Sequence, residues 1–238
     1  MSTIQIKGNR LKEISLNKKK SNYIFEKKMY DFLSCFSINK NYKKILDFGA
    51  GNSPFKQVFN FKDYISTDVE QNIFNSIDVL INTGNKTLPF ENNEFDLVLC
   101  LDVLEHVINP KEILLELNRV LKPNCKILIS IPFLFREHEY PTDFQRYTSI
   151  GINDILSKAG FKDIEIKKIG NFYYVVYLLW IGKVIKNGEK VNMSIFQKIY
   201  RKLLIKMSIF LLNSTLFQPD PEKDDSVFLS LFVSASVK

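Results

Sequence analysis

Apolar runs of strand length alternate with helix-like segments along the middle of this 238-residue chain. KKILDFG (43–49), FDLVLCLD (95–102) and CKILISIP (125–132) are nearly continuous apolar runs, as expected of strands that are buried on both faces. PKEILLELNRVLK (110–122) lies between two of them and has the apolar spacing of an amphipathic helix, with proline in its first turn. The alternation predicts an α/β fold, in which helices cover both faces of a mostly parallel sheet.

Further runs complete the prediction. Additional strands are expected at 63–68, 76–82, 162–170 and 226–237, and additional helices at 22–38 and 149–161. The sheet should therefore have seven strands. Ligands of such sheets bind beyond the carboxyl ends of the strands, so we expect the chemistry in the polar stretches that follow them.

Four segments follow from this pattern. Residues 1–42 are basic and predict a helical extension or lid, and residues 43–170 form the core. Residues 171–225 do not fit the alternation and are too long for a plain loop, so they predict a helical insert. Residues 226–238 return to the core as its last strand.

The net charge of +7 is unevenly distributed. Residues 1–44 hold eleven basic against three acidic side chains, and residues 183–206 hold seven against one. These flanks favour an anionic partner, although a solvated lysine-rich face explains them equally well. No apolar run reaches the roughly 20 residues that span a bilayer and the N-terminus lacks a signal-peptide pattern, so we expect a cytoplasmic protein. The three widely spaced cysteines show no metal-ligand pattern, and no metal is expected.

The turn after the first strand is the first informative motif. ILDFGAGNSPF (45–55) carries Asp47 at the strand end, followed by Gly49 and Gly51, and glycine permits a positive φ and a close approach of a ligand. Asp68 ends the next strand, where a carboxylate can accept both hydroxyls of a ribose. The loop lacks the third glycine of a dinucleotide-binding motif, and an acid beside it is unfavourable for a phosphate. The pattern therefore favours a cationic cofactor.

This LDxGxG motif and the second acid resemble the class I S-adenosylmethionine (SAM)-dependent methyltransferases of the type 11 kind. Residues 88–132, with LPF, FD, EHV and RVLKP, resemble the central block of the family, and the likeness spans roughly residues 43–165. The resemblance implies a Rossmann-like fold, SAM as cofactor and a methyltransferase enzyme. Many relatives carry an acid after the third strand that contacts the adenine amine; here NTGN (82–85) stands there, so an amide or the backbone would replace it. The cofactor-binding residues that the resemblance implies are Asp47, Gly49, Ala50, Gly51, Asp68, Val69, Asp102 and Val103.

FREHEYPTDFQRYTS (135–149) follows the fifth strand on the same edge of the predicted sheet. It resembles a pattern, PxxxxxHxxPxDxxRYT, of methyltransferases associated with surface-polysaccharide assembly. A hydroxyl acceptor gains from a general base near neutrality, so the two histidines of the chain, His138 and His106, are the catalytic candidates, with His138 preferred. The substrate-binding residues that the resemblance implies are Glu105, Arg136, Asp143, Arg146 and Tyr147.

Simpler roles for the same side chains stay open. His106 can cap the helix that follows it, and Asp143 and Arg146 can form a local ion pair that fixes the loop. Tyr147 can simply lead into the next helix, with Thr148 as its N-cap.

The expected reaction is methyl transfer to a hydroxyl of a sugar or nucleotide-linked precursor of a surface polysaccharide. One alternative is a quinone or lipid-like acceptor at the inner face of the membrane, because residues 194–211 combine an apolar stripe with a basic face. The same helix can instead be a lid or a homodimer contact. Another alternative is a non-catalytic SAM-binding scaffold. No nucleic-acid partner is expected, because no base-flipping motif is present.

Overall fold

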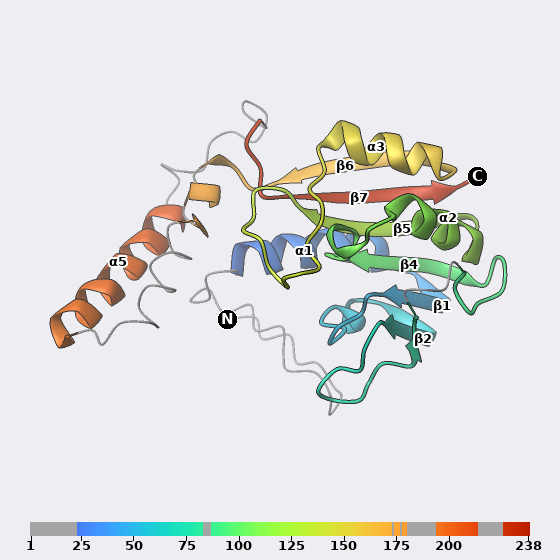
Figure 1. Cartoon of the computed structure of the whole chain (residues 1–238), viewed down its shortest axis with the longest axis horizontal. Coiled ribbons are helices and arrows are strands. Elements are labelled where there is room, and N and C mark those ends of the chain that lie inside the picture. The colour runs from blue at the N-terminus through green and yellow to red at the C-terminus, as the bar shows by residue number, and fades with distance from the viewer. Residues whose placement is uncertain (1–22, 83–86, 173, 177, 180–193, 214–225) are drawn as a thin grey trace.

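One mixed sheet forms the centre of the protein. The computed structural model describes residues 23–82, 87–172, 174–176, 178–179, 194–213 and 226–238. Within them seven strands pair in the order β3-β2-β1-β4-β5-β7-β6 (Figure 1). All neighbours are parallel except β7, which runs antiparallel to both β5 and β6. The strands are β1 (Asn41–Phe48), β2 (Asn60–Asp68), β3 (Val79–Leu80), β4 (Phe95–Leu101), β5 (Leu121–Pro132), β6 (Phe161–Ile169) and β7 (Ser230–Val237). The predicted seven-stranded, mostly parallel α/β sheet is confirmed.

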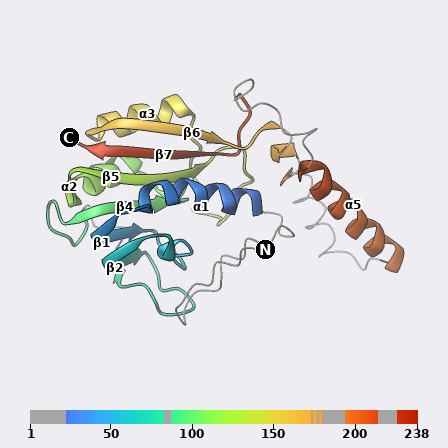
Figure 2. The same ribbon diagram turned by 180° about the vertical axis from the view of Figure 1, so that it is seen from behind.

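Helices cover both faces of this sheet. Helix α1 lies on one face and helices α2 and α3 lie on the other, as the two opposite views show (Figures 1 and 2). Strands β4, β5 and β6 are each followed by an α-helix before the next strand, whereas the link from β1 to β2 contains a single 3₁₀ turn. The helical elements are α1 (Tyr23–Ser37), η1 (Lys56–Val58), η2 (Leu104–His106), α2 (Pro110–Val120), α3 (Ser149–Lys158) and α5 (Ile195–Asn213).

The central strand β4 packs against both helical layers. Val98 and Cys100 lie in the core cluster under α2 and α3, whereas Leu97 and Leu99 lie in the cluster under α1. Successive side chains of a strand point to opposite faces, which explains why nearly every residue of this run is apolar. The site described below is therefore carried by strands that are fixed on both faces.

The strand register brings several polar residues to one edge of the sheet. Phe48 of β1 pairs with Thr67 of β2, and Leu101 of β4 pairs with Ser130 of β5. The parallel strands consequently end side by side, and the loops that follow them meet at this carboxyl edge.

The flanking segments are described in part. Helix α1 packs on the sheet through Met29 and Leu33, while residues 1–22 lie outside the described residues, so the predicted lid stays a prediction. Helix α5 stands apart from the sheet in both views, and Phe196 and Phe210 on it are 85% and 72% exposed (Figures 1 and 2). The remainder of the predicted insert lies largely outside the described residues. No described helix is both long and apolar enough to cross a membrane.

Candidate active site

Asp47 lies beneath the glycine loop at the end of β1. Its carboxylate is buried, and its Oδ2 atom accepts hydrogen bonds from the hydroxyls of Tyr64 (2.6 Å) and Ser53 (2.9 Å). Burial raises the pKa of Asp47 to about 6, against the opposing effect of these two donors. Because Ser53 belongs to the loop and Tyr64 to β2, this carboxylate ties the loop to the sheet. Its predicted contact with the methionine portion of a cofactor stays a prediction.

The two glycines of the loop serve different purposes. Gly49 has a φ of +68°, and a Cβ atom there would lie only 2.4 Å from Cγ2 of Val103. Gly51 has a φ of +51°, and a Cβ atom there would meet nothing within 4 Å. Between them, buried Ala50 donates its backbone N–H to the carbonyl of Thr67 (2.9 Å). Gly49 thus permits close packing against the β4 loop, while Gly51 borders open space in which a ligand can approach the backbone.

Replacing Gly49 by alanine should lower the free energy of unfolding by about 1–3 kcal/mol, because the added methyl overlaps Val103 and strains a left-handed backbone. Denaturant unfolding of purified protein measures this. The double variant with Val103→Ala should recover the part that comes from overlap but not the part that comes from φ. Gly51→Ala is the matched control, where only the backbone strain applies; equal losses in the two single variants would contradict the packing argument.

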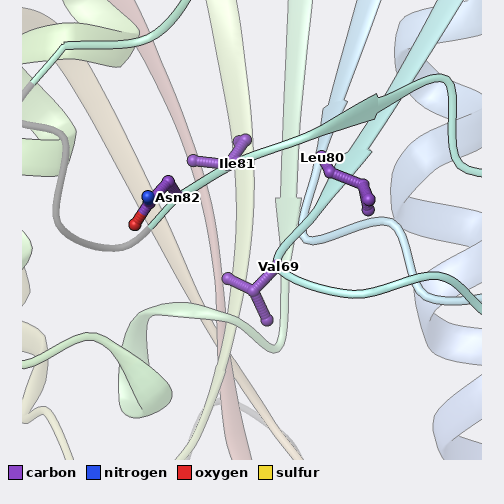
Figure 3. A pocket seen from close by; sticks show the side chains of 4 residues that line it. All are labelled: Val69, Leu80, Ile81 and Asn82. Atoms are coloured by element: carbon purple, nitrogen blue, oxygen red, sulfur yellow. The ribbon is translucent and has the colours of Figure 1, made fainter.

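Asp68 closes the other side of the loop. Its Oδ2 atom accepts the backbone N–H of Gly51 (2.9 Å), and its Oδ1 atom accepts the backbone N–H of Val69 (2.7 Å). Each carboxylate oxygen has a second lone pair, so the fixed carboxylate can still accept from a diol. A pocket of about 330 Å³ lies next to it, lined by Val69, Leu80, Ile81 and Asn82 (Figure 3). The predicted contact of Asp68 with ribose hydroxyls stays a prediction.

Asp102 and Val103 follow β4 and form what we call the Val103 loop. Asp102 has a φ of +54°, a conformation that Asp tolerates better than most residues. Ser130 of β5 donates its hydroxyl to Oδ1 of Asp102 (2.7 Å), and Asp102 donates its backbone N–H to the carbonyl of Ser130 (3.0 Å). These two bonds fix the chain direction at the point where β4 ends. Val103 follows and lies against Gly49 of the glycine loop, and η2 begins at the next residue.

Glu105, His106 and His138 come together beside Asp102 and form what we call the acid–imidazole cluster. Glu105 is fully buried, and its Oε1 atom lies 3.7 Å from Nε2 of His106 and 3.9 Å from Nε2 of His138. Burial, and secondarily the nearby charge of Asp102, raise the pKa of Glu105 to about 8. The two rings meet edge to face with centroids 4.9 Å apart. The structure thus brings both predicted histidines to one place.

The ring orientations of the two histidines are set from outside the cluster. Nδ1 of His106 lies 2.9 Å from the backbone carbonyl of Thr142, and a carbonyl can only accept, so this nitrogen carries the proton. Nδ1 of His138 lies 3.1 Å from Oδ2 of Asp143, within ion-pair distance but without the geometry of a hydrogen bond. The Nε2 atoms of both rings face Glu105. His106 does not cap α2, whose N-cap is Asn109.

The loop before α3 is held by a forked ion pair. Both Nη atoms of Arg146 donate to the Asp143 carboxylate, and the backbone N–H of His138 donates to the same carboxylate (3.0 Å). The guanidinium holds the pKa of Asp143 well below its usual range. The ion pair left open by the sequence is present, and its consequence is a fixed position for His138. Substrate contacts of Asp143 and Arg146 stay predictions.

Other predicted substrate residues have different surroundings. Tyr147 is buried, and its hydroxyl donates to the carbonyl of Leu104 (3.4 Å), so this side chain anchors the loop on η2. Arg136 is exposed at the start of the loop. Thr148 caps α3 by accepting the N–H of Gly151 (3.1 Å), as the sequence suggested. The roles of Tyr147 and Arg136 toward a substrate stay predictions.

Sequence reasoning missed the residues that position the site. Tyr64, Ser130 and Thr142 hold Asp47, Asp102 and His106, respectively. Their partners are 17, 28 and 36 residues away, so no local pattern could have identified them. Ser53 is the exception, because it lies within the loop motif, six residues after Asp47. Its position in the sequence could have indicated that its hydroxyl bonds to that carboxylate.

Comparisons with known proteins bear on the domain family and on the fold. Residues 46–129 match the methyltransferase domain family, which confirms the predicted methyltransferase domain for this segment. A curated relative, an uncharacterized protein of Methanocaldococcus jannaschii, is 32% identical over 136 residues, which are 50% of this chain and 65% of that protein. The chain spans less than two thirds of the length of the curated relatives that it matches.

Two solved structures show the same fold. The cyclase SpnF superposes with a TM-score of 0.58 and 14% identity, covering 89% of this chain and 81% of the cyclase. Phosphoethanolamine N-methyltransferase 2 of Haemonchus contortus, in complex with S-adenosyl-L-methionine, has a TM-score of 0.53 and 16% identity, covering 93% of this chain and 58% of that enzyme. At these identities the likeness establishes the Rossmann-like fold alone.

Proposed function

We propose that this chain, whose residues 46–129 carry a methyltransferase domain, is a SAM-dependent methyltransferase that acts on a small molecule with an oxygen nucleophile. The observation that carries the proposal is the placement of two complementary sites on one sheet edge. Asp68 and its pocket lie at the end of β2, and the acid–imidazole cluster lies after β4 and β5, which are on the opposite side of β1 in the sheet.

The described residues fit SAM. Asp68 would accept the ribose hydroxyls, Val69 and Leu80 would cover the adenine, and the amide of Asn82 would take the place of the missing acid. Gly51 lets the cofactor approach the backbone without a Cβ in the way. SAM supplies an electrophilic methyl group on a sulfonium. The protein's own contribution is to hold an acceptor in line with that methyl and to remove the acceptor's proton.

The acceptor oxygen is assigned to the acid–imidazole cluster. Two Nε2 atoms and a buried carboxyl converge there, which suits a hydroxyl that must lose a proton during the transfer. A sugar or nucleotide-linked precursor of a surface polysaccharide is the proposed acceptor. It is supported by the HxxPxDxxRYT pattern, in which Asp143 and Arg146 now have a clear task in positioning His138.

A quinone or lipid-like acceptor is the second candidate. It is favoured by α5, which exposes Ile195 (73%), Phe196 (85%) and Phe210 (72%) on a basic helix that could lie on an anionic membrane surface. The same apolar side chains could pair two copies of the chain. A non-catalytic scaffold is a third candidate, because the fold likeness to a cyclase shows that this fold is not tied to methyl transfer.

The test is incubation of the purified chain with isotopically labelled SAM and a panel of nucleotide-sugars, lipid extracts and RNA. Label transferred to a nucleotide-sugar supports the proposal, and label transferred only to lipid favours the second candidate. Binding of SAM without transfer to any class favours the scaffold. Absence of SAM binding together with binding of a nicotinamide nucleotide overturns the proposal.

Asp68→Asn should weaken the affinity for SAM by about 10- to 100-fold, because hydrogen bonds to a charged acceptor contribute about 1.5–3 kcal/mol. Isothermal titration calorimetry with SAM and with S-adenosylhomocysteine measures it. Asp63→Asn, at an exposed position on the same strand, is the matched control and should bind normally. An unchanged affinity in Asp68→Asn would remove this residue from the cofactor site.

A further inference from the structure

The carboxyl group of Glu105 has no ordinary partner. It is fully buried, and neither of its oxygens makes a hydrogen bond with any described residue. Its backbone carbonyl, by contrast, accepts the N–H groups of both Phe144 and Gln145, so the position of the residue is firmly fixed. A buried carboxyl without hydrogen-bond partners is unfavourable and rare, because buried ionisable groups are normally paired or coordinate a metal ion.

The neighbours of this carboxyl are two imidazole nitrogen atoms. Oε1 of Glu105 faces Nε2 of His106 at 3.7 Å and Nε2 of His138 at 3.9 Å. The other ring nitrogen of each histidine faces an acceptor, the carbonyl of Thr142 or the carboxylate of Asp143. Histidines that bind metals characteristically direct their second nitrogen to a carbonyl or carboxylate, which fixes the tautomer and the ring plane.

We propose that Glu105, His106 and His138 bind a divalent transition-metal ion, with Glu139 as a fourth ligand. One ligand atom from each of the first three lies within 4.8 Å of the others, and Oε2 of Glu139 lies 3.5 Å from Nε2 of His106. Ligands at about 2.1 Å from a common ion are separated by roughly 3–4 Å, so small side-chain rotations close the site. Glu139 is 69% exposed and can move inward.

The ligand set selects the class of ion. Imidazole nitrogens favour Zn²⁺, Fe²⁺ or Co²⁺, and carboxylate oxygens also accept Mn²⁺, whereas Mg²⁺ prefers oxygen ligands only. The sequence analysis expected no metal. The proposed ligands lie at adjacent positions 105 and 106 on η2 and on a loop 32 residues later. No fixed spacing in the sequence marks such a site.

The ion would give the proposed reaction a Lewis acid, and this role rests on the proposed function. A hydroxyl bound to the ion would have a lowered pKa and would release its proton to solvent at neutral pH. Its oxygen would then form a bond to the methyl carbon as the C–S bond of SAM breaks and S-adenosylhomocysteine leaves. His106 and His138 would then act as ligands, and Asp143 as the residue that positions His138.

Metal binding itself can be measured without any acceptor. The full chain, stripped with a chelator, is titrated with Zn²⁺ and with Mn²⁺ in competition with a fluorescent chelator, with Mg²⁺ as a comparison. We expect one equivalent of Zn²⁺ to bind, and we expect Glu105→Gln and His138→Ala each to weaken binding at least tenfold. Glu137→Gln, an exposed carboxyl on the same loop, and Cys35→Ser, which removes an exposed thiol, should bind as the wild type does.

Thermal unfolding with and without Zn²⁺ is a second measurement. If Glu105 had a purely structural role, the change in melting temperature on adding Zn²⁺ would be the same in the wild type and in Glu105→Gln. In chelator, Glu105→Gln should melt close to the wild type, because the amide has the same shape and is equally without hydrogen-bond partners in this pocket. Addition of Zn²⁺ should raise the melting temperature of the wild type and leave that of Glu105→Gln unchanged. If His138→Ala does not fold by circular dichroism, His106→Asn replaces it.

Two results would overturn the metal site: no saturable binding of Zn²⁺ or Mn²⁺, or equal affinity in the wild type and Glu105→Gln. These results leave the proposed function standing if labelled methyl is still transferred in the presence of chelator. One equivalent of Zn²⁺ lost in Glu105→Gln, without transfer to any acceptor, supports the site and counts against the function. The two ideas therefore fail separately.

Discussion

His138→Ala should lower the rate of methyl transfer by about 10²- to 10⁴-fold, while the affinity for SAM changes less than threefold. General acid–base groups contribute about this much to a proton transfer. Loss of a metal ligand would have a comparable effect on turnover. The affinity is spared because the proposed cofactor groups, Asp68 and its pocket, lie at the end of β2, which β1 separates from the strands that precede His106 and His138.

The measurement separates single-turnover rate from calorimetric SAM affinity in the same preparation. His138→Ala keeps the backbone N–H that bonds to Asp143, so the Asp143–Arg146 pair and the loop should remain in place. Glu137→Gln on the same loop should retain the wild-type rate. Equal losses of SAM affinity in His138→Ala and Asp68→Asn would show that the two sites are not divided as we describe.

The parts of the fold that the sequence predicted well are those in which one local pattern dominates. β4 and the second halves of β1 and β5 are buried, so their apolar runs are nearly uninterrupted. The limits of β4 were predicted to within one residue, whereas β5 begins at Leu121 and not at the expected residue 125. The helix expected at 149–161 ends at Lys158, because Gly160 with a φ of +89° follows and turns the chain into β6.

The predicted strand at 76–82 shrinks to two residues, Val79 and Leu80, for a reason that lies outside its own sequence. The side chain of Asp78 accepts both the backbone N–H of Ser66 (2.8 Å) and its hydroxyl (2.6 Å). The backbone N–H of Ser66 in β2 therefore bonds to this carboxylate and not to a backbone carbonyl of the neighbouring strand. Competition of this kind between side chain and backbone cannot be read from alternation of apolar residues.

The sequence predicted which residues belong to the candidate site, but it did not predict their hydrogen-bond partners or the orientations of their side chains. The glycine loop and the acids could be identified because the sheet topology places them on one edge. That Glu105 is unpartnered, and that both histidines direct Nε2 toward it, depends on Thr142 and Asp143. The Thr142–His106 contact and the Glu105–His138 approach join segments more than 30 residues apart, and only the folded chain reveals them.

Asp47→Asn should make the protein more stable at neutral pH, by roughly 3 kcal/mol at most, although Asp47 belongs to the proposed cofactor loop. The pKa of this buried carboxyl rises from 3.8 to about 6 on folding, and each unit corresponds to about 1.4 kcal/mol. An acid with a raised pKa contributes stability at low pH and loses it as pH rises toward the folded pKa. The neutral amide has no such loss.

The difference in unfolding free energy between Asp47→Asn and the wild type should therefore be small near pH 4, grow between pH 4 and 6, and stay constant above pH 6. Urea unfolding at a series of pH values measures it. Asp154→Asn, in an exposed ion pair with Lys158, is the control and should show no comparable growth. A difference that is the same at every pH would mean that burial does not govern this carboxyl. The expected pattern, combined with weaker SAM binding in the same variant, would show that the loop retains a destabilising acid because the cofactor requires it.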